Sequence, residues 1–212
     1  MIILLLGATG LVGRHVLEQA LADDRITRLV APTRRALRQH PKLLNPTASR
    51  LEELTHITAI TSVDAVICAI GTRISNAGSQ THFRQVEYAL PIEFAKAAHE
   101  GGAHALALVS APGASVSAPF FFSRTKGELE RDIQHIGFDS VTIIRPGMIS
   151  GDREEFRLAE RIVLPIASFL KPLLPRGLWI NPATNIAHVL IAAVMDRRPG
   201  LTMLSSRDLV EV

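Results

Sequence analysis

Three glycines near the start of the chain have the spacing of a phosphate-binding loop. In "LLLGATGLVGRHV", Gly7, Gly10 and Gly13 follow an apolar run and open a segment with helical periodicity. Glycine allows a tight turn, a close backbone approach to a diphosphate and close packing of helix on strand. Free amides at the helix start would face the phosphates, helped by the helix dipole. The expected contacts come from Gly7, Thr9, Gly10, Leu11, Val12 and Gly13. The alternative is a tight strand-to-helix turn with no ligand.

Two arginines follow the next apolar run and indicate which dinucleotide would bind. About 20 residues beyond such a loop, an acidic residue typically binds the ribose 2′-hydroxyl of NAD. Here the run continues into "APTRRAL", which has no acid and instead carries Arg34 and Arg35. A charge-assisted hydrogen bond to a 2′-phosphate is worth roughly 1.5–3 kcal/mol. We therefore expect NADP(H) rather than NAD(H), with Arg34 the better of the two contacts. The alternative is a solvated basic loop.

A lysine lies in the middle of an apolar helical stripe. Phe122 lies four residues before Lys126, and the apolar residues that follow it at three, seven and ten residues are Leu129, Ile133 and Ile136. These spacings place all of them on one helix face. The ammonium of Lys126 needs an anion, a hydroxyl or water there. A lysine that extends along the helix edge to solvent is the alternative.

The elements that must position these residues alternate along the chain. Expected strands cover residues 2–6, 26–31, 64–71, 105–110 and 140–147. Expected helices cover residues 11–23, 49–60, 81–102, 119–136 and 183–196. Pro91 should kink the third helix or mark a late start, and residues 36–48 show no clear pattern. The alternation predicts one α/β domain over residues 1–212. Its fold is a doubly wound, Rossmann-like parallel sheet, with a small C-terminal helical cap at 148–182 over the ligand crevice.

Composition limits the remaining classes of function. The 212 residues carry a net charge of +3, and the densest basic cluster is too small to predict a nucleic-acid surface. The initial apolar run stops at Gly7, and later apolar runs are broken by Lys171 and prolines, so neither a signal peptide nor a membrane span is expected. Cys68, the single cysteine, is expected to be a buried, inert thiol, and the histidines have no metal-ligand spacing. We therefore expect a cytoplasmic protein without a metal.

An ordered set of motifs resembles a known superfamily. The segments "GATGLVG", "TRR", "AIGTR" (69–73), "ALVSAPGAS" (107–115), Lys126-Gly127-Glu128 and "IIRPGMISGDR" (143–153) occur in that order. Together they resemble the small, atypical, NADP-binding branch of the short-chain dehydrogenase/reductases, and most closely its Tat-interacting-protein-like oxidoreductases. The resemblance implies cofactor contacts from Ala69, Ile70, Gly71 and Pro146. It implies that Lys126 binds the nicotinamide ribose and that Ser110 steadies a substrate oxygen.

The chain departs from that superfamily at the proton donor. In the superfamily a Tyr-x-x-x-Lys pair does chemistry, and here the tyrosine position holds Phe122. Positioned acid catalysis typically contributes about 10²–10⁴ in rate. The nearby hydroxyls are those of Ser110, Ser115, Ser117, Ser123 and Thr125, and each would need a water relay. Thr125 with Glu128 also fits a helix capping box.

Three functions follow from these residues. The first is an NADPH-dependent oxidoreductase that acts on a small carbonyl-type substrate. The second is a non-catalytic NADPH-binding sensor or regulatory protein with a protein partner. The third is an interaction domain without a ligand, which the glycine loop and the two arginines disfavour.

Overall fold

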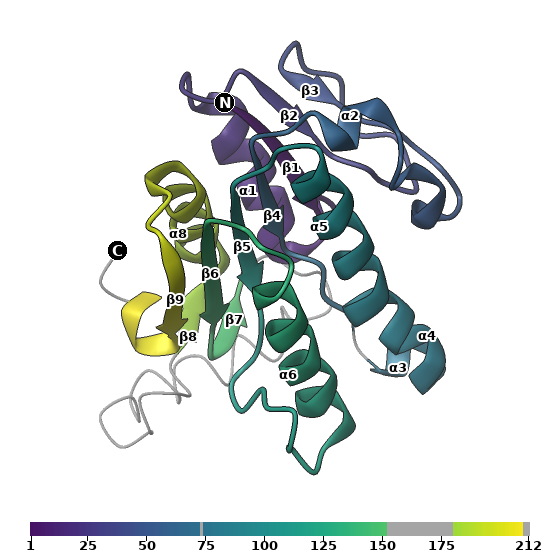
Figure 1. Cartoon of the computed structure of the whole chain (residues 1–212), viewed down its shortest axis with the longest axis vertical. Coiled ribbons are helices and arrows are strands. Elements are labelled where there is room, and N and C mark those ends of the chain that lie inside the picture. Colours follow the sequence, from purple (N-terminus) through teal and green to yellow (C-terminus); the bar gives the residue numbers. More distant parts are fainter. Residues whose placement is uncertain (73, 152–179, 210–212) are drawn as a thin grey trace.

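A seven-stranded parallel sheet forms the centre of the computed structural model, which describes residues 1–72, 74–151 and 180–209 (Figure 1). Its spatial order is β3-β2-β1-β4-β5-β6-β9. The strands are β1 (Ile2–Leu6), β2 (Arg28–Val30), β3 (Leu43–Leu44), β4 (Ala65–Cys68), β5 (Ala105–Val109), β6 (Ser140–Arg145) and β9 (Gly200–Ser205). The order reverses direction between β1 and β4, and ligands bind at such a switch point in doubly wound sheets. The predicted fold class is therefore confirmed.

Helices cover both faces of the sheet. The longer ones are α1 (Leu11–Ala22), α5 (Leu90–Glu100), α6 (Phe121–Gln134) and α8 (Ala183–Asp196). Alternate residues of β1 point to opposite faces: Ile3 and Leu5 join the core under α1 and α8, whereas Leu4 and Leu6 join the core under α5 and α6. Figure 1 shows these two helix pairs on opposite sides of the sheet. The near-continuous apolar strands of the sequence reflect burial on both faces.

Three parts of the chain differ from the sequence prediction. The helix expected at 49–60 is two short pieces, the 3₁₀ turn η1 (Leu51–Leu54) and α2 (Thr58–Thr61). Between them, the hydroxyl of Thr55 donates to the carbonyl of Glu52 at 2.9 Å, a local bond that competes with continued helix. The poorly patterned segment 36–48 contributes only β3, and the sheet's last strand, β9, was missed.

The expected helix at 81–102 contains a wider turn ahead of Pro91. It begins as α4 (Gln80–Arg84), passes through a π-helical segment (Gln85–Ala89) and continues as α5. Another short helix, α3 (Ile74–Ala77), precedes it. Proline lacks an N–H, and its ring collides with the carbonyl four residues earlier, which here belongs to Glu87. The predicted effect of Pro91 therefore takes the form of a π-helical turn, and the helix ends at Glu100, with Gly101 at its C-cap.

The expected cap is described only at its two ends. β7 (Met148–Ser150) and β8 (Ile180–Pro182) form a separate two-stranded parallel sheet, so these ends are strands rather than helices. The remainder of the predicted cap lies outside the described residues. Gly151 lies against α1, since a Cβ built on it would be 2.8 Å from Cδ1 of Leu11.

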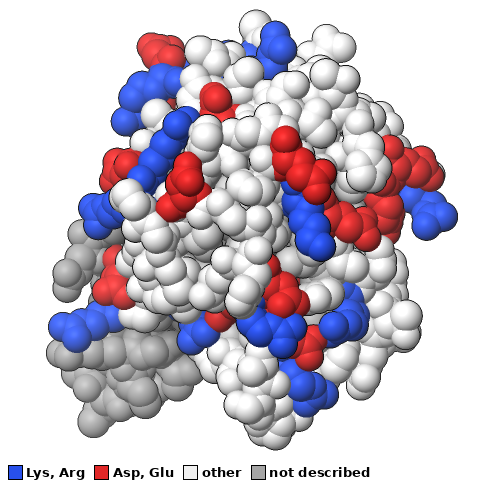
Figure 2. All heavy atoms as spheres, in the orientation of Figure 1, with Lys and Arg blue, Asp and Glu red and all other residues white. Residues whose placement is uncertain are grey.

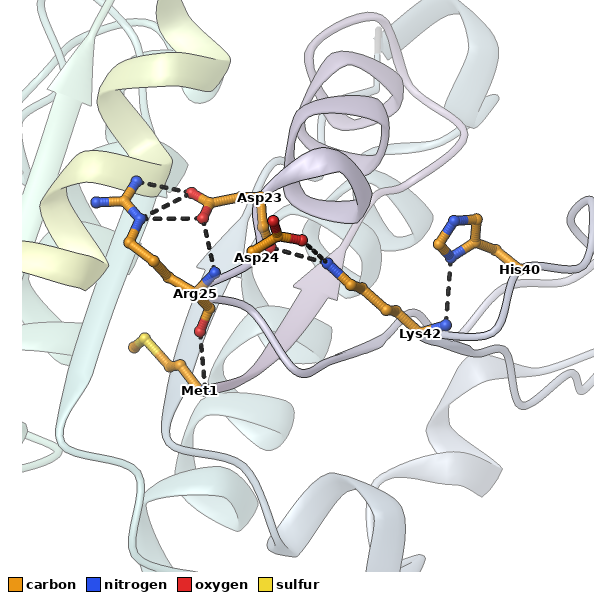
Figure 3. A network of polar contacts seen from close by, with 6 residues as sticks. All are labelled: Met1, Asp23, Asp24, Arg25, His40 and Lys42. Atoms are coloured by element: carbon orange, nitrogen blue, oxygen red, sulfur yellow. Dashed lines mark hydrogen bonds and ion pairs between the residues drawn. The ribbon is translucent and has the colours of Figure 1, made fainter.

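Charged contacts join the end of α1 to the strands that follow (Figure 3). The Asp23 carboxylate accepts from the Arg25 side chain and backbone, and the Arg25 carbonyl accepts from the N-terminal ammonium of Met1 at 3.1 Å. Lys42 Nζ donates to the Asp23 carbonyl at 3.1 Å and lies 3.4 Å from an Asp24 carboxylate oxygen. These contacts hold the α1–β2 turn against the segment before β3.

Positive and negative side chains are mixed on the surface. On the face shown in Figure 2, Lys and Arg lie interspersed with Asp and Glu, and the described residues of that face carry no broad patch of one sign. No helix in the described part of the chain is long and apolar enough to cross a bilayer. Within residues 1–72, 74–151 and 180–209, no three His, Cys, Asp or Glu side chains form a group that could hold a metal ion.

Candidate functional site

The glycine turn after β1 is packed too closely for larger residues. Gly7 has φ +88°, a left-handed conformation that favours glycine. A Cβ on Gly7 would lie 2.6 Å from the carbonyl oxygen of Ala69, and a Cβ on Gly13 only 1.9 Å from that of Gly7. At Gly10 the nearest atom would be 3.3 Å away. The turn therefore lies directly against the chain leaving β4, at the switch point of the sheet.

The first turn of α1 presents backbone amides without a side-chain cap. Gly10 occupies the N-cap position with extended backbone, and no side chain caps this helix end. The N–H of Gly10 donates to the Gly7 carbonyl at 2.9 Å, and the first intrahelical bond is that of Arg14 to Gly10 at 3.0 Å. The N–H groups of Leu11, Val12 and Gly13 therefore have no carbonyl one turn earlier in the helix to bond. Such amides, with the positive end of the dipole, suit a diphosphate.

Residues 69–71, which the resemblance implied as cofactor contacts, follow β4 next to this turn. Ala69 and Ile70 directly follow β4, and the Ala69 amide donates to the Leu6 carbonyl at 2.9 Å, which ties the ends of β1 and β4 together. Gly71 is exposed, with no atom within 4 Å of a Cβ built on it. Thr9 is exposed as well, whereas Leu11 and Val12 are buried. The backbone of Leu11 and Val12, rather than their side chains, is therefore the part that a ligand could contact.

Hydrogen bonds of Asn45 and Thr33 shape the loop that carries the two arginines. The Asn45 amide group donates to the Ala31 carbonyl at 2.6 Å and to the Thr33 hydroxyl at 2.7 Å, and its oxygen accepts from the Leu37 amide at 2.8 Å. The Thr33 hydroxyl in turn donates to the Arg35 carbonyl at 2.7 Å. Thr33 and Asn45 were missed from the sequence, because their contacts depend on the parallel pairing of β2 with β3.

Arg34 and Arg35 are both exposed at the tip of that loop. Neither forms an ion pair with a carboxylate of the described residues. Their guanidinium groups are therefore available to an anion arriving beyond the end of β2. No acid lies beside them in the sequence to favour a ribose 2′-hydroxyl instead.

Lys126 is buried and paired with an acid that the sequence did not suggest. Its side chain is 5% exposed and its Nζ lies 2.5 Å from Oε2 of Glu87, whose side chain is 1% exposed. The contact is a close ion pair without hydrogen-bond alignment, so Oε2 has no aligned donor. Oε1 accepts from the amide of Thr72. The alternative of a lysine reaching solvent along the helix edge is excluded by this burial.

Cys68 ends β4, and Ser110 directly follows the neighbouring strand β5. Ser110 is 6% exposed, and its hydroxyl is one of two buried side-chain atoms in the described residues without a hydrogen-bond partner. A buried, unpaired hydroxyl is costly, so this atom fits a role towards a ligand. Cys68 is buried as predicted, and burial raises the pKa of its thiol to about 11, with Glu87 raising it further and Lys126 opposing. It is therefore a neutral, inert thiol at physiological pH.

Phe122 belongs to an aromatic cluster. The ring of the fully buried Phe83 lies 5.9 Å from that of Phe122 and 5.6 Å from that of Phe121. Position 122 is half-buried, so its ring packs on α4 and still reaches the surface. The single tyrosine, Tyr88, donates its hydroxyl to Asp132 at 2.6 Å, and that bond raises its pKa. Tyr88 therefore does not replace the missing donor.

Three of the other hydroxyls near Phe122, those of Ser115, Ser117 and Thr125, have local partners. Thr125 donates to the Phe121 carbonyl at 2.9 Å within α6, and Ser115 and Ser117 contact each other at 3.0 Å. The capping box expected for Thr125 and Glu128 is wrong, because α6 begins at Phe121 and Thr125 lies a full turn inside it. Glu128 instead pairs with Arg84.

A buried asparagine fixes the turn after β6. Pro146 is buried, and the next amide, of Gly147, donates to Oδ1 of Asn181 at 2.7 Å. Asn181 is fully buried, accepts also from the Ser206 hydroxyl at 2.7 Å, and donates to the Ser206 carbonyl at 2.8 Å. Sequence reasoning missed this contact, since it joins three segments far apart in the chain.

Two hollows among the described residues lie away from these groups. One of about 600 Å³ adjoins residues 36–45, and one of about 560 Å³ lies between α5 and α6 beside Tyr88 and His99. Neither is lined by the glycine turn, Lys126 or Ser110. The candidate site is therefore defined by its contacts, its free amides and its unpaired hydroxyl.

Comparisons with known proteins agree with this fold. A family model described as "NAD(P)H-binding" matches residues 7–163. A Candida albicans protein named "Protein FMP52, mitochondrial" is 36% identical over 188 residues, which are 84% of this chain and 78% of that protein. The structure of "MoeE5 in complex with UDP-glucose and NAD" has a TM-score of 0.72 at 16% identity, covering 100% of this chain and 80% of that one. A short chain dehydrogenase family protein from Francisella tularensis has a TM-score of 0.69 at 15% identity and covers 98% of both chains.

The names of the relatives correct one expectation. Relatives from Candida albicans, Emericella nidulans and Aspergillus fumigatus are all named mitochondrial, which contradicts the expected cytoplasmic location. The expectation came from the absence of a signal-peptide pattern, which does not distinguish the cytoplasm from a mitochondrion. The family match over residues 7–163 establishes that this chain belongs to the NAD(P)H-binding family, and the solved structures share its Rossmann-like fold.

Proposed function

We propose that this chain binds NADPH across the β1–β4 switch point and acts as an oxidoreductase on a small carbonyl-type substrate. The observation that carries the proposal is the uncapped start of α1, laid against the chain leaving β4 with no space for a Cβ at Gly7 or Gly13. The amides of residues 11–13 would bind the diphosphate. Arg34, with Arg35 beside it, would bind the 2′-phosphate.

The remaining groups suit the reacting end of the cofactor. When bound, NADPH supplies a hydride. Lys126 would hydrogen-bond the nicotinamide ribose, Pro146 would border the ring, and the unpaired hydroxyl of Ser110 would donate to a substrate oxygen. These roles come from the superfamily's motifs at matching positions and are supported by the burial of Lys126 and Ser110.

A titration tests the cofactor part of the proposal. We expect NADPH to bind at least tenfold more tightly than NADH, since a charge-assisted hydrogen bond to a 2′-phosphate contributes roughly 1.5–3 kcal/mol. Arg34→Ala should remove most of that difference and leave NADH binding unchanged. The measurement is quenching of protein fluorescence, and equal affinities for the two cofactors in the wild type would contradict the assignment.

A non-catalytic NADPH sensor is the second candidate, and Phe122 favours it. No hydroxyl stands at position 122, and its ring is packed against Phe83. Phe122→Tyr keeps the ring and adds a hydroxyl, so it should preserve NADPH binding and create or raise reductase activity towards a panel of small aldehydes and ketones. An oxidoreductase predicts measurable turnover by the wild type on that panel, whereas a sensor predicts none. Fast turnover by the wild type that the tyrosine slows would show that position 122 has been misinterpreted.

A further inference from the structure

We propose that Glu87 is a positioning residue of the dinucleotide site, which fixes the Lys126 ammonium and the turn at residues 69–72 to one carboxylate. The proposal rests on the proposed NADPH binding and deepens it. Glu87 is 1% exposed, its Oε1 accepts from the Thr72 amide, and its Oε2 lies 2.5 Å from Lys126 Nζ. Thr72 follows Ala69, Ile70 and Gly71 directly, so the acid joins two expected contact regions.

The local backbone explains why Glu87 points inward. It lies in the π-helical segment before Pro91, whose ring cannot be accommodated next to a normally placed Glu87 carbonyl. Its neighbours turn outward: Arg84 has a side chain 44% exposed and pairs with Glu128, and Tyr88 bonds Asp132. π-helical turns in helices occur frequently at functional sites. Here the turn places a carboxylate in the core between β4 and α6.

The charges around Lys126 make this contact specific. The π-helical segment contributes the carboxylate of Glu87 near Lys126. Strand β4 contributes Cys68, whose thiol is neutral because burial raises its pKa to about 11. In the described part of the chain, Glu87 is the carboxylate paired with Lys126. An ammonium has three donors, and one close carboxylate leaves the others for a further acceptor. Glu87 thus anchors the lysine without using all of its hydrogen-bonding capacity.

This arrangement predicts that removing the Glu87 charge lowers affinity only for ligands that carry the nicotinamide half of the cofactor. With Glu87→Gln, the amide side chain can still accept from Thr72, but the buried ammonium loses its anchoring charge. We expect NADPH affinity to fall about tenfold, as for loss of one hydrogen bond to a charged group. Adenosine 2′,5′-bisphosphate carries the 2′-phosphate but no nicotinamide ribose. Its affinity should change less than about twofold, within the usual limits of additivity for distant sites.

A double-mutant cycle supplies the second readout. Lys126→Met should weaken NADPH binding to a similar extent. The double variant Glu87→Gln/Lys126→Met should bind NADPH no more weakly than either single variant, because both changes remove one shared contact. Glu128→Gln is the matched control, since this α6 acid pairs with Arg84 on the outer side. It should leave both affinities unchanged.

Each outcome has a distinct meaning. If Glu87→Gln does not fold but the neutral double variant does, the coupling is supported, since an uncompensated buried charge is destabilising and a neutral pair is tolerated. The double variant must then show the selective loss of NADPH affinity. Unchanged NADPH affinity in Glu87→Gln or in the double variant, or an equal loss for both ligands, overturns the proposal for Glu87 alone. A wild type that binds neither ligand overturns the proposed function, and this proposal with it.

Discussion

The three glycines of the first turn meet different steric demands. Gly7 adopts φ +88°, which only glycine takes easily. A Cβ on Gly10 would lie 3.3 Å from the carbonyl oxygen of Gly7, a close contact that a small shift could relieve. Gly13 has ordinary helical backbone, but its Cβ would meet the carbonyl oxygen of Gly7 at 1.9 Å. At this position the requirement for glycine comes from packing rather than from conformation.

Gly13→Ala sets two effects against each other. Alanine gains about 1 kcal/mol of helix propensity over glycine, whereas forcing a methyl group into backbone at this distance typically costs 1–3 kcal/mol or more. Because the opposing atom is backbone and cannot rotate away, we expect a net loss of about 1–2 kcal/mol, measured by urea denaturation. Gly71→Ala is the control, since its Cβ meets nothing within 4 Å. A Gly13→Ala protein at least as stable as the wild type would contradict this account.

At the scale of elements, the junction of α1 and β2 depends on Asp23 (Figure 3). The Arg25 side chain, and then its backbone amide, lower the pKa of Asp23 from 3.8 to about 2. A lowered pKa in the folded state means that the contribution to stability is complete above about pH 4. It is lost as the pH falls towards 2.

Asp23→Asn should therefore remove a stabilisation that depends on pH. The gap in unfolding free energy between wild type and variant should shrink between pH 5 and pH 2.5. Because Arg25 is 68% exposed, we expect the gap to stay below about 1 kcal/mol. Asp24→Asn is the control, since its side chain is fully exposed. A gap that is constant across this range, measured by urea unfolding at each pH, would show that the Arg25 contacts contribute nothing.

At the scale of the whole molecule, Asn181 joins segments that are distant in the sequence. Its three hydrogen bonds connect the turn after β6, strand β8 and the segment after β9 (Figure 1). They hold Gly147, and with it Pro146, at the edge of the candidate site. The same hydrogen bonds lie at the ends of β6 and β9, which pair in parallel.

Asn181→Ala should be the most destabilising of these substitutions. It removes the acceptor of the half-buried Gly147 amide and the buried hydrogen bond to the Ser206 carbonyl. Each unsatisfied buried group costs about 1–3 kcal/mol. We expect a total loss of about 2–4 kcal/mol in chemical denaturation. Gln39→Ala, at an exposed position, should change stability by less than about 0.5 kcal/mol. A loss of stability for Asn181→Ala as small as that of this control would mean that water replaces the hydrogen bonds of Asn181.

The sequence located most elements because their signals are local. Apolar runs such as 2–6 and 105–109, and the 3.6-residue periodicity of α6, report burial directly. Strand β9 was missed because its side chains are mostly half or fully exposed, and its place depends on pairing with β6. The prediction of one helix at 49–60 was wrong because the hydrophobic periodicity gives no sign of the local hydrogen bond made by the Thr55 hydroxyl.

The same division holds for the candidate site. The sequence by itself determined the glycine turn, the arginines without an acid beside them, and an ammonium in an apolar stripe, because spacing along one element decides each of them. Only the tertiary structure decided that Glu87 meets Lys126, that Asn45 shapes the arginine loop and that Asn181 holds Gly147. Those contacts join residues 8 to 39 positions apart, and the pairing of strands and packing of helices, rather than any local pattern, bring them together.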